Sequence, residues 1–298
     1  MIECIGCPPI QLILEESTMY LFNRKVFLFP VILLLFLAVC RLKQPDTPLE
    51  GKNIVCIGDS LFGMCRNNSS VTAHLSRISG ATVFNAGFGG CRMSVHPTQG
   101  YDAFSMWALA DALTENDWHA QDLAAPLGSE YFPEHLAALK AIDLTEVDIM
   151  VIHYGTNDFA ASVPLDNPND RMDPQTLCGA LRYSIDTLQN AYPHIAIYIS
   201  LPVYRFWVKD DVITFAEDYR NKNGITLMDI CKSMQAIADE YELPVIDNYS
   251  ELGICADNAS EFLYDGTHLN KAGRKLFASH IASQLIAGTP SADPSISP

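Results

Sequence analysis

A short apolar run that ends in a glycine and a serine constrains this chain more than any other feature. Residues 53–57 read Asn-Ile-Val-Cys-Ile, and Gly58-Asp59-Ser60-Leu61 follows directly. A β-branched, uncharged run of this length predicts a buried strand of a parallel sheet, and the glycine permits a sharp turn. A serine just past that turn lies at the carboxyl edge of the sheet, where open α/β folds bind ligands. Ser60 is therefore a candidate nucleophile.

Strands and helices are expected to alternate along the rest of the chain. Four more apolar segments predict strands, at residues 82–84, 148–153, 195–200 and 244–246. Helical periodicity is found at residues 71–78, 101–113, 132–139, 177–188, 227–241 and 277–285. Residues 114–130 lack it and are expected to be irregular. The alternation predicts one domain with a five-stranded parallel sheet and helices on both faces.

The first 43 residues are expected to form a leader. Residues 26–40 are a run of 15 apolar residues preceded by Arg24-Lys25. A helix of that length spans about 22 Å, short of the ~30 Å hydrocarbon core, so the run is more typical of a secretory signal. Residues 37–40 resemble a lipoprotein box that would tether the protein through Cys40. Secretion and anchoring both stay open, as does a start at Met1 or Met19.

The predicted domain organisation follows from these segments. Residues 44–51 are a linker rich in proline and glycine, residues 52–286 are the folded domain, and the proline- and serine-rich residues 287–298 are a disordered tail. We expect an extracytoplasmic protein, with a possible membrane tether through the N-terminal segment.

Charge and cysteine spacing exclude several classes of function. From residue 44 onwards the chain carries 15 basic and 32 acidic residues, which disfavours nucleic acid as a partner. The nine cysteines lack zinc-type spacing, and there is no H-E-x-x-H motif, so neither a metal nor a cofactor is expected. Cys65 and Cys91 lie near the predicted site loops. A disulfide between them and two separate thiols both stay open.

Four loops at predicted strand ends carry the residues that acyl transfer requires. Ser60 can attack a carbonyl, and His268 can serve as its base. Asp265, three residues earlier, can orient the other ring nitrogen. The glycines at 87, 89 and 90 let a backbone N–H face a substrate, and Asn157 can add a side-chain N–H.

These blocks, in this order, resemble the SGNH hydrolases, also called GDSL esterases. The resemblance rests on Gly58-Asp59-Ser60-Leu61, the glycine-rich turn, Gly155-Thr156-Asn157-Asp158 and Asp265-Gly266-Thr267-His268, and it covers residues 52–286. It implies a flavodoxin-like three-layer α/β/α sandwich and a catalytic Ser60, His268 and Asp265. It also implies an oxyanion hole made by the Ser60 N–H, the Gly90 N–H and the Asn157 side chain. Gly90 is chosen because the family's oxyanion glycine lies five residues after an asparagine like Asn85.

Other readings of these motifs remain. Ser60 alone could cap a helix, and Asn157 could be a turn residue. The glycine-rich turn lacks the G-x-G-x-x-G spacing of a dinucleotide site, and Phe62 stands where an α/β-hydrolase elbow needs a glycine. We expect a serine esterase acting on small acyl esters, chiefly O-acetyl groups on carbohydrate. Alternatives are an acyltransferase on cell-surface polysaccharide, a lysophospholipase or lipase, and a non-catalytic carbohydrate-binding relative.

Three aromatic residues are candidates for stacking on a sugar ring. They are Trp118, Tyr204 and Trp207. Packing under a loop is the commoner use of such side chains.

Overall fold

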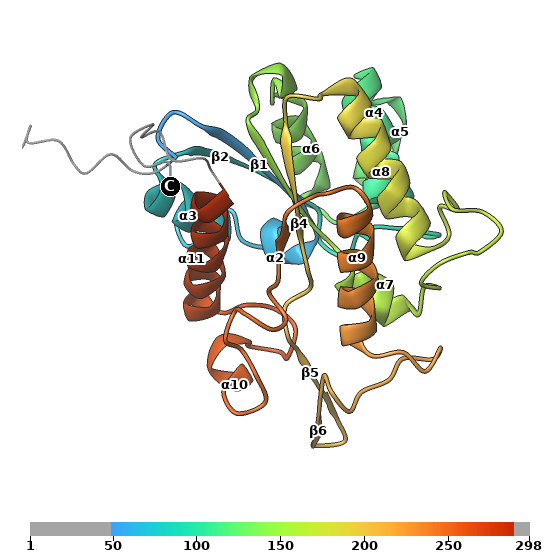
Figure 1. Ribbon diagram of the computed structural model, residues 1–298, viewed down its shortest axis with the longest axis vertical. Helices are drawn as coiled ribbons and strands as arrows, with labels where there is room; N and C mark the ends of the chain where they lie inside the picture. Colours follow the sequence, from blue (N-terminus) through green and yellow to red (C-terminus); the bar gives the residue numbers. More distant parts are fainter. Residues whose placement is uncertain (1–48, 289–298) are drawn as a thin grey trace, which may run out of the picture. The chain divides into compact units, whose positions relative to one another are not determined.

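Five parallel strands form the central sheet, in the spatial order β2-β1-β3-β4-β7 (Figure 1). The structure, a computed structural model, describes residues 49–288. The sheet strands are β1 (Asn53–Gly58), β2 (Thr82–Gly87), β3 (Ile149–His153), β4 (Ala196–Ser200) and β7 (Val245–Ile246). All neighbouring strands in this sheet pair in parallel. The five predicted strands and their parallel arrangement are confirmed.

Helices cover both faces of the sheet (Figure 1). On one face α3 (Val71–Ser79) packs against α11 (Lys271–Gly288). The other face carries α4 (Met106–Glu115), α6 (Phe132–Lys140), α8 (Leu177–Ala191) and α9 (Leu227–Glu240). Every residue of β3 is buried, as expected for a strand that is covered on both sides. The predicted three-layer α/β/α fold is therefore confirmed.

Capping side chains explain where several of these helices begin. Ser70 accepts a hydrogen bond from the Ala73 N–H at the start of α3. At α9, Thr226 and Asp229 bond to each other's backbone in a capping box, which satisfies two N–H groups that the helix leaves unpaired. Ser105 caps α4, so this helix begins at Met106 rather than at the expected residue 101; a short 3-10 turn, η1 (Asp102–Phe104), precedes it.

Several short elements were not expected from the sequence. They are α2 (Ser60–Gly63), α5 (His119–Ala124), α7 (Thr156–Ala161), α10 (Ala259–Phe262), η2 (Ala125–Leu127) and η3 (Leu144–Glu146). The expectation that residues 114–130 are irregular is wrong, because α5 and η2 lie there. A helix of six residues is too short to give a periodic apolar pattern.

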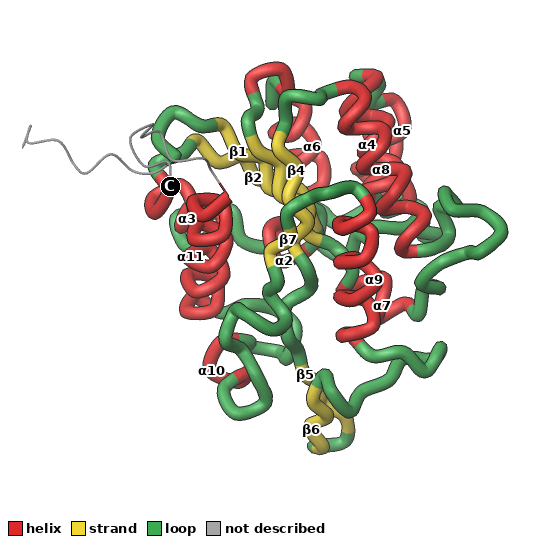
Figure 2. The backbone as a smooth tube through the Cα atoms, in the orientation of Figure 1, coloured by secondary structure: helices red, strands yellow, loops and turns green. Residues whose placement is uncertain are grey.

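An antiparallel hairpin after β4 was also missed. Strands β5 (Phe206–Lys209) and β6 (Val212–Phe215) form a separate two-stranded sheet, which extends beyond the carboxyl end of the main sheet (Figure 2). Its turn residues Asp210 and Asp211 both have positive φ, at 49° and 62°. Tight hairpin turns of this kind usually contain glycine, and the absence of one hid the hairpin.

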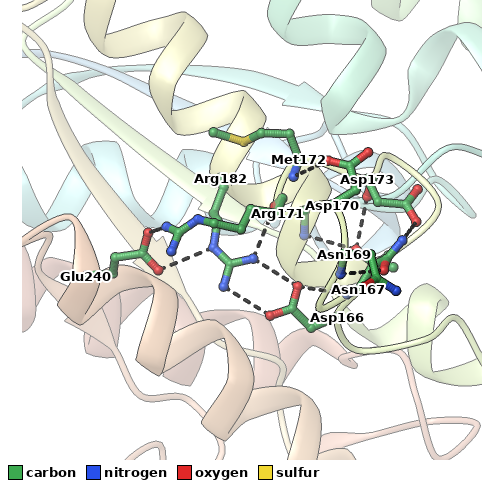
Figure 3. Close-up of polar contacts among 11 residues, drawn as sticks. Asp166, Asn167, Asn169, Asp170, Arg171, Met172, Asp173, Arg182 and Glu240 are labelled. Atoms are coloured by element: carbon green, nitrogen blue, oxygen red, sulfur yellow. Dashed lines mark hydrogen bonds and ion pairs between the residues drawn. The ribbon is translucent and has the colours of Figure 1, made fainter.

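The polar loop of residues 163–174 is held in place by arginines (Figure 3). Arg182 donates two hydrogen bonds to the Asp166 carboxylate, at 2.9 and 3.1 Å, and a third to Glu240 at 3.2 Å. Arg171 pairs with the same Glu240. Each of these guanidinium groups therefore has a carboxylate partner.

The folded domain begins before its predicted start at residue 52. Leu49 is buried, and its N–H donates to the Ser79 carbonyl at 3.1 Å. The predicted leader, residues 44–48 of the linker and residues 289–298 of the tail lie outside the described residues. Within residues 49–288, no helix is both long and apolar enough to cross a membrane.

Candidate active site

A chain of hydrogen bonds joins Asp265, His268 and Ser60. Ser60 is the first residue of α2, directly after β1, and the Asp59 side chain caps this helix by accepting from the Leu61 N–H at 2.9 Å. His268 lies in the loop before α11. Its Nε2 is 3.0 Å from Ser60 Oγ, and its Nδ1 is 2.6 Å from Asp265 Oδ2. The structure thus brings together the three residues that the sequence pointed to.

The Asp265 carboxylate is held as an anion. Burial raises the pKa of Asp265, but hydrogen bonds from the His268 ring, the His268 N–H and the Thr267 N–H outweigh it and leave this pKa below its ordinary value. An ionised Asp265 fixes His268 with Nδ1 protonated, so Nε2 is free to accept a proton from Ser60.

Two backbone N–H groups beside Ser60 have no acceptor within residues 49–288. One is the N–H of Ser60 itself, in the first turn of α2, and the other is the N–H of Gly90. Gly90 has φ of +82°, a conformation that L side chains rarely adopt. The Gly87 N–H, by contrast, donates to Asn85 Oδ1 at 3.0 Å, and the Tyr131 hydroxyl lies close to Gly89.

Asn157 comes from the first turn of α7, after β3. Its Nδ2 donates to the Cys91 carbonyl at 2.9 Å and lies 3.5 Å from Asp59 Oδ2. The Cys91 contact anchors the side chain next to the glycine-rich turn. The second amide hydrogen has only the long contact to Asp59, so a stronger acceptor can take it.

Two buried carboxyl groups lie beneath these loops. Asp158 accepts hydrogen bonds from the N–H groups of Met93 and Ser94 and from the Ser94 hydroxyl, which fixes the segment after Gly90. Burial raises the pKa of Asp59 from 3.8 to about 7; the nearby Asp158 adds to the increase, while the Leu61 N–H and Arg205 oppose it.

Arg205 is a site residue that sequence reasoning missed. It is buried, and its two terminal nitrogens donate to the hydroxyls of Thr156 at 2.9 Å and Thr267 at 2.6 Å. Thr156 precedes Asn157, and Thr267 precedes His268. Arg205 therefore ties the loop of the base to the loop of the amide. In the sequence, the only sign of this role was that Arg205 stands between aromatic residues just after the strand predicted at residues 195–200.

The aromatic candidates are occupied by other contacts. Tyr204 is buried, and its hydroxyl donates to Glu217 at 2.6 Å. The Trp207 ring stacks on Tyr219 at 3.9 Å and lies under the Arg205 guanidinium at 4.6 Å. Trp118 packs against the core and donates to Asn116. None of the three contacts the small pocket beside Ser60.

That pocket has a volume of about 90 Å³. It is lined by Ser60, Leu61, Met64, Cys65, Tyr264, His268, Leu269 and Arg274. Tyr264, which is 57% exposed, stacks against His268. The aromatic residue that lines this pocket is thus Tyr264, which the sequence analysis did not single out.

The thiols of Cys65 and Cys91 are both free, and Cys91 is buried. A disulfide between them is therefore not formed in this structure. Residues 49–288 contain no cluster of His, Cys, Asp and Glu that could hold a metal ion.

The raised pKa of Asp59 predicts a pH-dependent difference in stability. Because the folded state holds the proton more tightly, Asp59 contributes stability that is full below pH 3.8 and is lost as the pH rises through about 7. Asp59→Asn keeps an oxygen for the Leu61 N–H but cannot ionise. Its free energy of unfolding, relative to wild type, should rise by on the order of 2 kcal/mol between pH 5 and pH 8. Urea unfolding at both pH values measures this, and a difference that does not change with pH would contradict it.

Comparison with known proteins agrees with this geometry. Residues 56–276 match the model of the GDSL-like lipase/acylhydrolase family. No protein with a curated description matches the chain. One crystal structure is 26% identical with a TM-score of 0.60, covering 82% of this chain and 100% of its own.

Two further solved structures share the fold. A protein from Lactobacillus plantarum is 18% identical, with a TM-score of 0.60 over 81% of this chain and 99% of its own. A possible lipase from Chitinophaga pinensis is 17% identical, with a TM-score of 0.52 over 78% and 96%. Since the family model spans most of the chain, this protein belongs to the GDSL-like lipase/acylhydrolase family, the SGNH hydrolases, and is a carboxylic-ester hydrolase.

Proposed function

We propose that this protein is a serine esterase that removes small acyl groups, chiefly O-acetyl groups on carbohydrate, through an acyl-enzyme on Ser60. The observation that carries the proposal is the hydrogen-bond chain from Asp265 through His268 to Ser60. Two unpaired N–H groups, of Ser60 and Gly90, stand beside it. Nucleophile, base, orienting carboxylate and oxyanion donors are the parts that acyl transfer needs.

Acylation begins when Ser60 Oγ attacks the ester carbonyl carbon. His268 Nε2 takes the hydroxyl proton, and Asp265 stabilises the resulting imidazolium. The carbonyl oxygen becomes an oxyanion that accepts hydrogen bonds from the N–H groups of Ser60 and Gly90 and from Asn157. His268 then gives its proton to the departing alcohol oxygen as the carbon–oxygen bond breaks.

Deacylation repeats these steps with water as the nucleophile. His268 accepts a proton from the water, the oxyanion forms again in the same place, and Ser60 leaves with the proton that His268 returns. The products are the free acid and the regenerated enzyme.

The surroundings of Ser60 favour a short acyl group. A Cβ built on Gly89 would lie 2.3 Å from the Tyr131 hydroxyl and 3.5 Å from Ser60 Cβ, so Tyr131 stands close beside the nucleophile. The oxyanion donors Gly90 and Asn157 do not line the pocket of about 90 Å³ beside Ser60, so the acyl group lies outside this pocket, on the side of Gly89 and Tyr131. A long acyl chain would find little room beside Tyr131.

A sugar as the alcohol is supported by the open mouth of this pocket. Tyr264 and Met64, both more than half exposed, offer an aromatic and an apolar surface there, and such surfaces suit the apolar face of a sugar ring. The N-terminal leader supports an extracytoplasmic location, secreted or membrane-anchored, where surface polysaccharide would be within reach.

A hydrolysis screen tests this function. Protein starting near residue 44 should release acetate from acetylated sugars, and among aryl esters it should cleave acetate faster than butyrate and butyrate faster than octanoate. Ser60→Ala should abolish all of these activities while melting at the wild-type temperature. Faster cleavage of octanoate than of acetate would refute the short-acyl assignment, and full activity in Ser60→Ala would refute the mechanism.

Asn157→Ala separates an oxyanion donor from a residue that only shapes a turn. Loss of one such donor typically lowers kcat by on the order of 10²–10³, while KM should change little because the ground-state carbonyl depends less on it. The melting temperature should stay close to that of wild type. Steady-state kinetics with an aryl acetate, together with thermal unfolding, measure all three quantities. A wild-type kcat would mean that the oxyanion is held by backbone N–H groups alone.

A further inference from the structure

The pocket beside Ser60 has a basic wall in an otherwise acidic protein. Arg274, from the first turn of α11, lines the pocket together with Ser60 and His268. From residue 44 onwards the chain holds about twice as many acidic as basic residues. A cation at this position is therefore opposite in sign to the protein as a whole.

The Arg274 guanidinium is fixed by neutral acceptors. Its Nε donates to the Ser69 carbonyl at 2.7 Å, Nη1 to the Leu269 carbonyl at 2.7 Å, and Nη2 to the Ser69 hydroxyl at 3.2 Å. A guanidinium has five N–H donors, so two remain, one on each terminal nitrogen. No carboxylate of residues 49–288 lies within 4.0 Å of it. The group is rigidly placed, and its charge is not neutralised by an ion pair.

The arginines of the 163–174 loop show the opposite pattern. There Arg171 and Arg182 are both paired with carboxylates (Figure 3). Arg274, like Arg205, fastens its loop through neutral groups, so its charge is not cancelled by an ion pair at the pocket.

Three more cations lie on the same two helices, α3 and α11, as His74 and Arg274. Arg77, Lys275 and Lys271 act together with Arg274 on His74, whose pKa is lowered first by burial and then by these four positive charges. Lys271 and Lys275 are exposed, and no ion pair to either is found in the described part of the chain. The Asp265 carboxylate, which is hydrogen-bonded to His268, acts on the pKa of the pocket residue Tyr264 with the opposite sign to Arg274. Arg274 is therefore one of four cations gathered on α3 and α11.

The position of the pocket indicates which part of the substrate it receives. It is lined by Ser60 and His268 but by neither Gly90 nor Asn157, so it lies on the side of the base and away from those two oxyanion donors. His268 must deliver its proton to the oxygen of the leaving alcohol. The alcohol part of the ester consequently lies on this side.

We propose that the pocket is a subsite for an anionic group on the alcohol, so that the substrate is an acylated sugar bearing a carboxylate or a phosphate. The inference rests on the proposed esterase function. Arginine donates well-directed hydrogen bonds to both kinds of anion, and the surrounding lysines raise the local concentration of such substrates.

Three matched substrates test the subsite: a mono-O-acetylated methyl glucoside, its uronic acid and its sugar phosphate. Wild type should show a kcat/KM about tenfold or more higher for at least one anionic ester than for the neutral one, and the comparison of the two anionic esters distinguishes carboxylate from phosphate. The preference should shrink in 0.5 M salt, because salt screens the attraction. Arg274→Gln should remove most of the preference, because kcat/KM should fall much further on the anionic esters than on the neutral one.

Further variants keep the test decisive if Arg274→Gln loosens the Ser69 and Leu269 contacts. Lys271→Gln combined with Lys275→Gln removes two exposed charges, and it should reduce the preference about threefold. Lys232→Gln removes an exposed charge from α9, on the opposite face of the sheet (Figure 1), and it should change nothing.

The outcomes separate the two proposals. Equal rates on neutral and anionic esters in wild type, or equal losses on both in the variants, would overturn the anionic subsite and leave the esterase function standing. Failure to hydrolyse any ester would overturn the function itself.

Discussion

The hydrogen bond between Ser60 Oγ and His268 Nε2 joins residues that are 208 positions apart in the sequence. The fold brings these two atoms to within 3.0 Å of each other. The parallel sheet places the end of β1 and the ends of its neighbours β2 and β3 at one edge. Close packing sets the distances there: a Cβ on Gly87 would lie 2.4 Å from the Gly63 nitrogen, so α2 rests directly against the end of β2. Packing of α11 against α3 then fixes the loop that presents His268.

Buried charge holds the two halves of the site together. The guanidinium of Arg205 contacts Thr156 and Thr267, and burial lowers its pKa to about 10 against the opposing influence of Asp59 and Asp265. Asp59 lies 3.5 Å from the Asn157 amide, where a full negative charge would oppose a developing oxyanion. The Arg205 guanidinium offsets this negative charge, and the raised pKa of Asp59 lowers the fraction of the carboxyl that is ionised. Arg205 is thus a positioning residue that also balances the charge beneath the site.

The fold and the candidate triad could be predicted because both are encoded locally. Apolar runs marked the five strands, and Ser60, Asp265 and His268 lie in short motifs at strand ends or before a helix. Features that depend on tertiary contacts were missed. Arg205 acts through two threonines distant in sequence, and the hairpin turns at Asp210-Asp211 without a glycine.

The surface at the site was harder to predict than the triad. From the sequence, Trp207 is a candidate for stacking on a sugar, but in the fold Tyr219 and Arg205 cover its ring, whereas Tyr264 is exposed at the pocket. Net charge likewise gave no sign of the basic wall at Arg274, since it averages over the whole surface.

The central claim is that the ester's acyl group passes through Ser60. Mass spectrometry of enzyme quenched in acid during turnover of an activated aryl acetate tests it most directly. The account predicts one added acetyl group, located on the peptide that contains Ser60 and absent from Ser60→Ala. An acetyl group on another residue that forms and decays at the rate of turnover would contradict it.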